Sequence, residues 1–284
     1  MTLPDGYGSG RGSPIHPFEY AASRFRHGPL LQRHEWLWRV MRPAYEAVLW
    51  ALYPRGIEWV INGTDRIVVS PHWRTTADVH EPEIWRSLMG ELRPDDTVAD
   101  VGAGIGTYTL AIAKRLGPLG RVVALEPDAS NFKWLKIHVA LNRVGNKVEL
   151  MNCVAGDHDG EVEFLTDLGA LSRVRPESST RTRRVRSVRL DRVFATRPLQ
   201  LLVMDVEGYE GKVLEGAAHL LRDSRRAPRT LYIELHHRFW GETGTNGQSI
   251  QELLTQSGYR LTTLDGQPVE RLEGLWDVVA RRIS

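Results

Sequence analysis

A glycine-rich segment between two apolar runs constrains the fold of this chain more than any other feature. The apolar run Thr97–Val101 is followed at once by Gly102-Ala-Gly104-Ile-Gly106, and a second apolar run ends at Glu126. Glycine allows backbone conformations and close approaches that a side chain forbids. A strand, a glycine turn, a helix and a second strand that ends in an acid predict a nucleoside-binding α/β domain.

The spacing of the glycines indicates which cofactor such a domain would bind. The dinucleotide fingerprint has glycines at its first, third and sixth positions, but here the third glycine is at the fifth position and Thr107 stands at the sixth. Asp100 precedes the loop by two residues, and a carboxylate there repels a pyrophosphate but attracts a cationic sulfonium. We therefore expect S-adenosylmethionine, with Glu126 accepting hydrogen bonds from the ribose hydroxyls.

Composition limits the class of protein. The 284 residues, 42% hydrophobic and 25% charged, fit one α/β domain with an elaborated end. No apolar run approaches the roughly 20 residues that span a bilayer. Cys153 is the only cysteine, so no internal disulfide is expected and a cytoplasmic location is predicted. The net charge of +2 creates no global field that would demand a nucleic-acid partner.

The pattern of residues predicts three segments. Residues 1–17 are rich in Gly, Pro and Ser and are expected to be disordered. Residues 18–90 are expected to form an extension, with a helix over 34–52 that Pro43 kinks or splits, and a hairpin that turns at Asn62-Gly63. Six of the nine tryptophans precede residue 91, where they either pack the extension against the main domain or line an acceptor pocket. Residues 91–284 form the predicted main domain.

Predicted strands and helices alternate in the main domain, which indicates a parallel sheet with helices on both faces. The predicted strands are 97–101, 121–126, 147–152, 162–166, 185–190, 201–205, 230–235, 260–263 and 276–280, with the last two antiparallel. The predicted helices are 107–116, 129–141, 212–221 and 250–257. Ligands bind such sheets outside the C-terminal strand ends, where Asp100, Glu126, Asp205 and His236 all fall.

Two strand ends carry candidate catalytic groups. Asp205 ends an apolar strand, and Glu207 would point the same way in extended backbone. Their possible tasks are binding the methionine ammonium, orienting an acceptor hydroxyl and accepting its proton. Glu234 and His236 again share a face, and histidine titrates near neutrality. Asp205 or His236 is thus the candidate base and Glu207 the orienting group, whereas Glu210 is interpreted as a helix N-terminal acid.

Further polar residues leave alternatives open. Asp157, after Ala155-Gly156, would read the adenine amino group or serve only as a turn residue. Adjacent His236 and His237 cannot easily share a metal ion and the sequence shows no convincing three-ligand cluster, so no metal is expected. Eight arginines lie between Arg173 and Arg192, either on a solvated strand edge or against an anionic small molecule or glycan. The absence of interleaved aromatic residues disfavours RNA.

The chain resembles the FkbM family of S-adenosylmethionine-dependent methyltransferases. The resemblance covers about Thr97 to His236, and its blocks are Asp100-Val-Gly-Ala-Gly-Ile-Gly-Thr-Tyr-Thr, Ala124-Leu-Glu-Pro-Asp with Asn131-Phe, Asp205-Val-Glu-Gly-Tyr-Glu with Val213-Leu-Glu-Gly-Ala217, and Ile233-Glu-Leu-His236. It implies a class I methyltransferase fold, a Rossmann-like seven-stranded sheet with an antiparallel last strand, and O-methylation of a sugar, glycan or polyketide hydroxyl. Ala103-Gly104 stands where many members have Ala-Asn.

The resulting hypothesis is an O-methyltransferase that acts on a hydroxyl of a sugar, glycan or natural-product small molecule. Its expected cofactor-binding residues are Asp100, Gly102, Gly104, Gly106, Glu126, Asp157 and Asp205. One alternative is an RNA or protein methyltransferase that uses the arginine run, and another is a non-catalytic nucleoside-binding protein. The sequence leaves the oligomeric state open, with a homodimer as one option.

Overall fold

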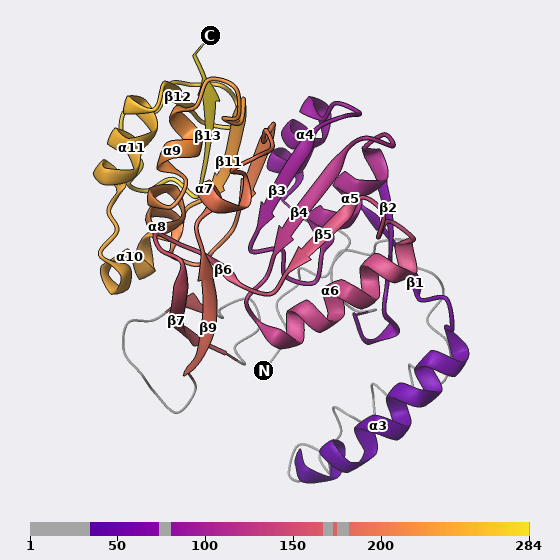
Figure 1. Cartoon of the computed structure of the whole chain (residues 1–284). Helices are drawn as coiled ribbons and strands as arrows, with labels where there is room; N and C mark the ends of the chain where they lie inside the picture. The colour runs from indigo at the N-terminus through magenta and orange to yellow at the C-terminus, as the bar shows by residue number, and fades with distance from the viewer. Residues whose placement is uncertain (1–34, 74–80, 167–172, 175–181, 284) are drawn as a thin grey trace. The chain divides into compact units, whose positions relative to one another are not determined.

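The computed structural model describes residues 35–73, 81–166, 173–174 and 182–283 (Figure 1). The chain divides into two compact units, Met1–His80 and Glu81–Ser284. Residues 1–17, for which the sequence predicts disorder, lie outside the described ranges, as do residues 175–181 of the arginine run. The predicted boundary near Glu91 falls at the end of a helix in the second unit.

The first unit contains a helix and a hairpin. Its elements are α3 (Glu35–Leu52), β1 (Ile57–Ile61), β2 (Asp65–Val69) and the short 3₁₀ helix η1 (Pro71–Trp73). Pro43 lies inside α3 and does not split it in two. The hairpin prediction is confirmed, because β1 and β2 pair antiparallel and the turn residues Asn62 and Gly63 have positive φ angles of 49° and 73°. Trp59 and Ile67 are buried.

The second unit is built on a central sheet, in which the described strands number seven. From edge to edge they are β12 (Tyr259–Thr262), β13 (Asp277–Arg282), β11 (Thr230–Glu234), β10 (Leu201–Met204), β3 (Thr97–Val101), β4 (Arg121–Leu125) and β5 (Val148–Met151). β13, the last strand of the chain, runs antiparallel to both of its neighbours, and the other adjacent pairs are parallel. The predicted class I methyltransferase fold is confirmed.

The strand order places the ligand crevice. The chain runs outward from β3 through β4 to β5, then returns to the opposite side of β3 with β10 and β11. Such a reversal opens a crevice beyond the carboxyl ends of the two strands that flank it, here β3 and β10. The central strands are mostly apolar and buried, for example at Val98, Val123 and Leu202, because both faces of the sheet are covered.

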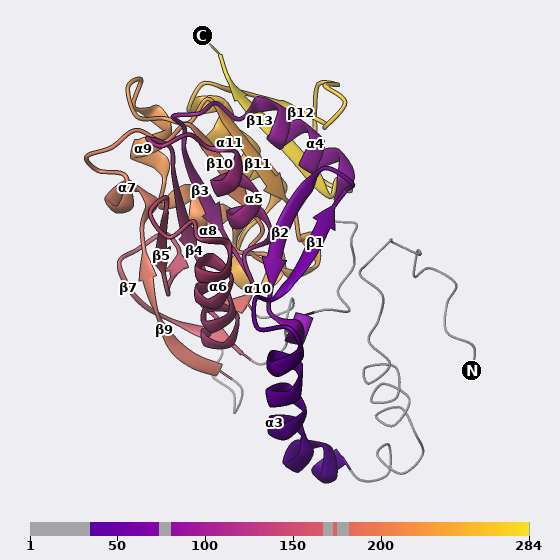
Figure 2. The ribbon, with the colours of Figure 1, turned by 90° about the vertical axis from the view of Figure 1, so that its right-hand side faces the viewer.

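Helices pack on both faces of this sheet (Figures 1 and 2). One face carries α4 (Pro82–Glu91), α5 (Thr107–Arg115) and α6 (Ala129–Asn142), and the other carries α8 (Glu210–Glu215), α9 (Ala218–Arg222) and α11 (Gly247–Gln256). The remaining helices are α7 (Leu190–Val193) and α10 (His237–Thr243). No helix within the described ranges is long and apolar enough to cross a membrane.

A small sheet follows β5 and lies beside the carboxyl ends of the central strands (Figure 1). Its strand order is β6 (Val154–Ala155), β9 (Thr182–Val188), β7 (Gly160–Leu165) and β8 (Arg173–Val174). The strands predicted at 162–166 and 185–190 correspond to β7 and β9, each of which begins earlier than expected. Phe164 and Val174 of this sheet are buried.

The main difference from the predicted elements is a helix break. The predicted helix 212–221 is two helices, α8 and α9, that meet around Gly216. A Cβ at Gly216 would lie 1.8 Å from the Gly156 carbonyl oxygen, so the chain passes β6 too closely for any other residue. The helices α4 and α10, which the sequence analysis did not predict, flank the central strands.

Candidate active site

The three glycines of the loop between β3 and α5 have two different roles. Gly102 has a φ of +87°, and a Cβ there would lie 1.7 Å from the Asp205 carbonyl oxygen. Gly106 has a φ of +101°, and its Cβ would lie 2.6 Å from Leu135 Cδ1 on α6. A Cβ at Gly104 would meet nothing within 4 Å, and this residue lines a pocket. Two of the glycines therefore allow close packing, while Gly104 faces the cavity.

The backbone N–H groups of this loop already have acceptors. Gly102 and Ala103 both donate to the Leu125 carbonyl at 3.0 Å, and Gly104 donates to Glu126 Oε2 at 2.8 Å. A phosphate-binding loop instead points its N–H groups at the ligand. With an acidic side chain as the partner of Gly104, the loop is unsuited to a pyrophosphate, in agreement with the glycine spacing.

Glu126 binds the glycine loop through its side chain. Its side chain is buried and also accepts the Asp128 N–H, at 2.8 Å to Oε1. Burial raises the pKa of Glu126 to about 7, although the two N–H bonds and Asn131 oppose the rise. Each carboxylate oxygen accepts one backbone hydrogen bond and keeps a second lone pair. Glu126 thus lines the cavity as a hydrogen-bond acceptor whose side chain is fixed by two backbone N–H groups.

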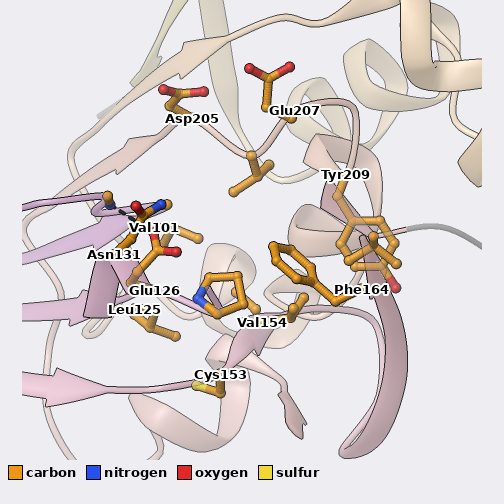
Figure 3. Close-up of a pocket in the computed structure, with 16 residues that line it drawn as sticks. Val101, Leu125, Glu126, Asn131, Cys153, Val154, Phe164, Asp205, Glu207 and Tyr209 are labelled. Atoms are coloured by element: carbon orange, nitrogen blue, oxygen red, sulfur yellow. Dashed lines mark hydrogen bonds between the residues drawn. The ribbon is translucent and has the colours of Figure 1, made fainter. Parts of the chain in front are cut away.

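A pocket lies beyond the ends of β3, β4 and β10 (Figure 3). Figure 3 shows two different walls. The apolar wall contains Leu125, Pro127, Val154, Phe164 and Val174, with Tyr209 beside them. The acidic groups are Glu126 on one side and Asp205 and Glu207 on the other. The cavity therefore offers apolar surface for an aromatic base and carboxylates for hydroxyls and cations.

Not every expected cofactor residue faces this pocket. Asp100 is buried and accepts a hydrogen bond from the Thr109 hydroxyl, which ties α5 to β3, and burial raises the pKa of Asp100 to about 6. Asp157 forms ion pairs with His158 at 2.7 Å and Lys212 at 3.2 Å. Gly106, Asp100 and Asp157 do not line the cavity, whereas Gly102, Gly104, Glu126 and Asp205 do.

A second set of charged groups gathers where β10 and β11 end. His236 is 5% exposed, and its Nε2 lies 3.6 Å from Asp205 Oδ1 and 3.4 Å from Glu234 Oε1. Glu207 Oε2 lies 3.8 Å from the same nitrogen. The predicted pairs Asp205/Glu207 and Glu234/His236 are thus brought together, because β10 and β11 are neighbours in the sheet.

Glu210 binds the Nδ1 side of the His236 imidazole. It is completely buried, and its Oε1 accepts hydrogen bonds from His236 Nδ1 at 2.9 Å and from the His236 and Gly208 backbone N–H groups at 3.1 Å. Its Oε2 accepts from Trp240 Nε1 at 2.8 Å. The interpretation of Glu210 as an N-terminal acid is confirmed, because α8 begins at this residue, but nothing in the sequence indicated that its side chain also binds His236. Glu210 orients the imidazole so that Nε2 faces Asp205 and Glu234.

The surroundings of His236 set its charge. Burial lowers its pKa, but hydrogen bonds to Glu210 and Glu234 and the charges of Asp205 and Glu207 outweigh burial and raise the pKa to about 10. Burial, followed by the charge of Glu234, raises the pKa of Asp205 well above its usual range. Burial also raises the pKa of Glu207. The raised pKa favours, at neutral pH, a cationic imidazole whose charge opposes those of the surrounding carboxylates.

Glu207 departs from the extended backbone that the sequence analysis assumed. Its φ is +44°, in the left-handed region that side chains disfavour. Its buried Oε2 has no hydrogen-bond partner within the described chain, although Arg238 lies 3.6 Å away. Such strain persists where the surrounding structure imposes it, and it concentrates at functional sites.

Sequence comparison identifies the family. A family model described as "Methyltransferase FkbM domain" matches residues 100–261, more than half of the chain. The chain belongs to the FkbM methyltransferase family. The predicted resemblance is confirmed, and the matched region includes the glycine loop, Glu126, Asp205 and His236.

Individual relatives of this FkbM-family chain are distant. The 31-O-demethyl-FK506 methyltransferase FkbM of Streptomyces tacrolimicus is 30% identical over 115 residues, which cover 40% of this chain and 43% of that protein. The AMB antimetabolite synthetase AmbE of Pseudomonas aeruginosa is 28% identical over 214 residues, which cover 60% of this chain and 10% of that protein. The chain thus spans less than half the length of these curated relatives. The crystal structure of methyltransferase FkbM from Methylobacillus flagellatus has a TM-score of 0.46 at 18% identity, covering 74% of this chain and 52% of that one.

The arginine run of this FkbM-family chain is partly neutralised. Arg184 pairs with Glu161 at 3.2 Å, across the β7–β9 ladder. Arg189 and Arg192 lie 3.5 and 3.6 Å from Asp159. In the described part of the run, these pairs fit the interpretation of a solvated, charged strand edge.

Proposed function

We propose that the chain is an S-adenosylmethionine-dependent O-methyltransferase whose acceptor is a hydroxyl of a sugar, glycan or natural-product small molecule. The observation that carries this proposal is a single pocket with Glu126 at the end of β4 and Asp205 and Glu207 after β10, joined by an apolar wall. Family membership supports methyl transfer. The name of the relative that acts on 31-O-demethyl-FK506 supports oxygen as the acceptor atom.

The residues present fit the cofactor. Glu126 has lone pairs left to accept hydrogen bonds from two ribose hydroxyls. The apolar wall of Leu125, Pro127 and Phe164 suits the adenine ring. Asp205, which lines the pocket, would bind the methionine ammonium. These residues, with Gly102 and Gly104, would hold S-adenosylmethionine, whereas the positions of Asp100, Gly106 and Asp157 favour structural roles.

The same pocket supports a division of catalytic roles. When bound, S-adenosylmethionine supplies a methyl group that passes to the acceptor oxygen while sulfur keeps the electron pair of the broken C–S bond. A hydroxyl is a weak nucleophile until its proton leaves. Asp205 and Glu207, whose pKa values are raised chiefly by burial, are the candidates to accept that proton. The cationic His236 would orient them as a positioning residue.

Isothermal titration tests the proposal. We expect the full chain to bind S-adenosylmethionine and S-adenosylhomocysteine at micromolar Kd and to show no binding of NAD. Glu126→Ala should weaken binding at least tenfold, and Glu149→Ala should not. Glu149 is the matched control because it lies on the adjacent strand β5 and pairs with Arg197 outside the pocket. NAD binding, or equal effects of the two variants, would contradict the assignment of the pocket.

Turnover separates the enzyme from a non-catalytic nucleoside-binding protein. Acceptors with sugar or macrolide hydroxyls would be screened for release of S-adenosylhomocysteine. We expect Glu207→Gln to lower turnover at least a hundredfold while changing the Kd of the cofactor less than threefold, because it removes a proton acceptor and keeps the shape of the side chain. An equal loss of cofactor affinity would assign Glu207 to binding instead.

A further inference from the structure

Three potential metal ligands converge at the edge of the pocket. They are Asp205 at the end of β10 and Glu234 and His236 at the end of β11, and one ligand atom of each lies within 4.8 Å of the others. His236 Nε2 lies 3.4 Å from Glu234 Oε1 and 3.6 Å from Asp205 Oδ1. Ligands about 2.1 Å from a tetrahedral metal ion are about 3.4 Å apart. The two separations from His236 Nε2 therefore match the spacing of metal ligands, and the third pair of atoms lies within 4.8 Å.

The histidine is held as metal-binding histidines are. A ligating imidazole almost always donates its other ring N–H to a carboxylate or carbonyl, which fixes the ring and aims the free nitrogen at the metal. Here Nδ1 donates to Glu210, which is completely buried and also accepts from Trp240 and two backbone N–H groups. His236 is itself 95% buried. Glu210 therefore fixes the orientation of the imidazole without being one of the three potential ligands.

The charge around His236 favours a bound cation. Four carboxylates lie within 4 Å of its two ring nitrogens, those of Asp205, Glu207, Glu210 and Glu234. Burial makes the mutual repulsion of these carboxylates more costly. A metal ion binds the neutral imidazole, so a divalent ion at Nε2 would place two positive charges where a proton would place one.

We propose that Asp205, Glu234 and His236 bind a divalent first-row transition-metal ion. An imidazole nitrogen beside two carboxylates suits such an ion better than Ca²⁺ or Mg²⁺, which prefer oxygen ligands. Asp205 also lines the pocket, so an ion there would have open positions for an acceptor oxygen and would lower the pKa of its hydroxyl. Metal binding stands on the ligand geometry alone, and the activation of a hydroxyl rests on the proposed methyl transfer.

Titration with Mn²⁺, followed by electron paramagnetic resonance, tests the site in the full chain after treatment with a chelator. We expect one Mn²⁺ per chain at micromolar Kd, and at least a tenfold weaker Kd in Glu234→Gln and in His236→Gln. Asp277→Asn is the control. Asp277 is the register partner of Glu234 on β13 and carries the same charge, but it is not one of the three ligands. Its variant should change the Kd less than threefold. Thermal melts would establish that each variant is folded.

Three outcomes would overturn the proposal. They are no bound Mn²⁺ at 1 mM, an unchanged Kd in both ligand variants, and an equal loss in Asp277→Asn, which would indicate nonspecific attraction to negative charge. Titration of the same samples with S-adenosylmethionine separates this proposal from the proposed function. Glu234 does not line the pocket, so Glu234→Gln should keep its cofactor affinity. Failure of wild-type chain to bind the cofactor would reject the function and leave the metal site standing.

Discussion

At the residue scale, Glu126 predicts how cofactor binding depends on pH. Its pKa in the free chain is raised to about 7, chiefly by burial, with the charge of Asp128 adding to the rise. The ionised form accepts more hydrogen bonds from hydroxyls, so affinity should increase as the pH rises through 7. With a pKa near 7, the ionised fraction grows about tenfold between pH 6 and pH 8. We therefore expect the Kd of S-adenosylmethionine to fall about tenfold over this range.

Calorimetric titration at pH 6, 7 and 8 measures this dependence. The control is Glu126→Gln, which keeps the size of the side chain but does not titrate. It should bind more weakly and show a pH dependence at least threefold smaller, since any titration of the ligand itself is common to both proteins. The same slope in both proteins would mean that another group controls affinity.

The backbone conformation of Glu207 predicts that its replacement by glycine raises stability and lowers activity. Its left-handed φ of +44° costs about 1 kcal/mol in a residue with a side chain, and its buried Oε2 has no hydrogen-bond partner in the described chain. Glu207→Gly removes both costs and should raise Tm by about 2–4 °C while abolishing turnover. Arg143→Gly is the control, because Arg143 has a φ of +57° at the C-terminal cap of α6. It should raise Tm similarly and leave turnover unchanged. A lower Tm in Glu207→Gly would show that its ion pairs outweigh the strain.

At the element scale, the two glycines Gly102 and Gly104 should respond differently to the same change. Both have positive φ, so alanine costs about 1–2 kcal/mol at either position. At Gly102 the new Cβ also overlaps the Asp205 carbonyl, which joins the loop after β3 to the end of β10. Gly102→Ala should therefore lose about 3 kcal/mol or more of stability. Gly104→Ala should lose only the backbone cost but bind the cofactor at least tenfold more weakly.

Urea unfolding and calorimetric titration of the two variants give the comparison. Gly258→Ala, at a φ of +82° with open space around it and far along the chain from the loop, measures the backbone cost alone. Equal stability losses in Gly102→Ala and Gly258→Ala would show that the loop moves away from Asp205 without cost.

The sequence predicted correctly the elements whose bounds depend on residues close together in the chain. The strand Thr97–Val101 was predicted to the residue and β4 to within one, because short apolar runs bounded by turn residues are specific for buried strands. The break between α8 and α9 was missed because it depends on the approach of Gly156, which is distant in the sequence. The helix α10 was missed because seven residues are too few for a periodic pattern.

The same distinction applies to the site. Glu126, Asp205 and His236 could be placed at strand ends from the sequence, since parallel strands end at one edge. The contact of His236 with Glu210 could not, because it depends on where α8 begins inside the core. The convergence of Asp205, Glu234 and His236 could not be predicted for a related reason. His236 and His237 are neighbours in the sequence, whereas the three side chains that converge come from the ends of two neighbouring strands, β10 and β11.

At the scale of the whole molecule, the pocket belongs to the second unit. Within the described part of the chain, the residues that line it lie between Val101 and Tyr209, in Glu81–Ser284. The helix α4 at the start of this unit is integrated with the sheet. Its Trp85 ring lies 5.1 Å from that of Tyr108, and its last residue, Glu91, accepts a hydrogen bond from the Tyr232 hydroxyl at 2.8 Å. Cofactor binding should thus require α4 but not the residues before it.

Two shortened chains test this expectation. A chain of residues 81–284 should bind S-adenosylmethionine within threefold of the full chain and unfold cooperatively. A chain of residues 91–284 loses Ile84, Trp85, Leu88 and Met89, all buried. Each such side chain contributes about 1.5–3 kcal/mol, so their loss approaches the stability of a typical domain, about 5–15 kcal/mol. This chain should lack a cooperative thermal transition. If it instead unfolds cooperatively and binds normally, the functional domain begins after α4.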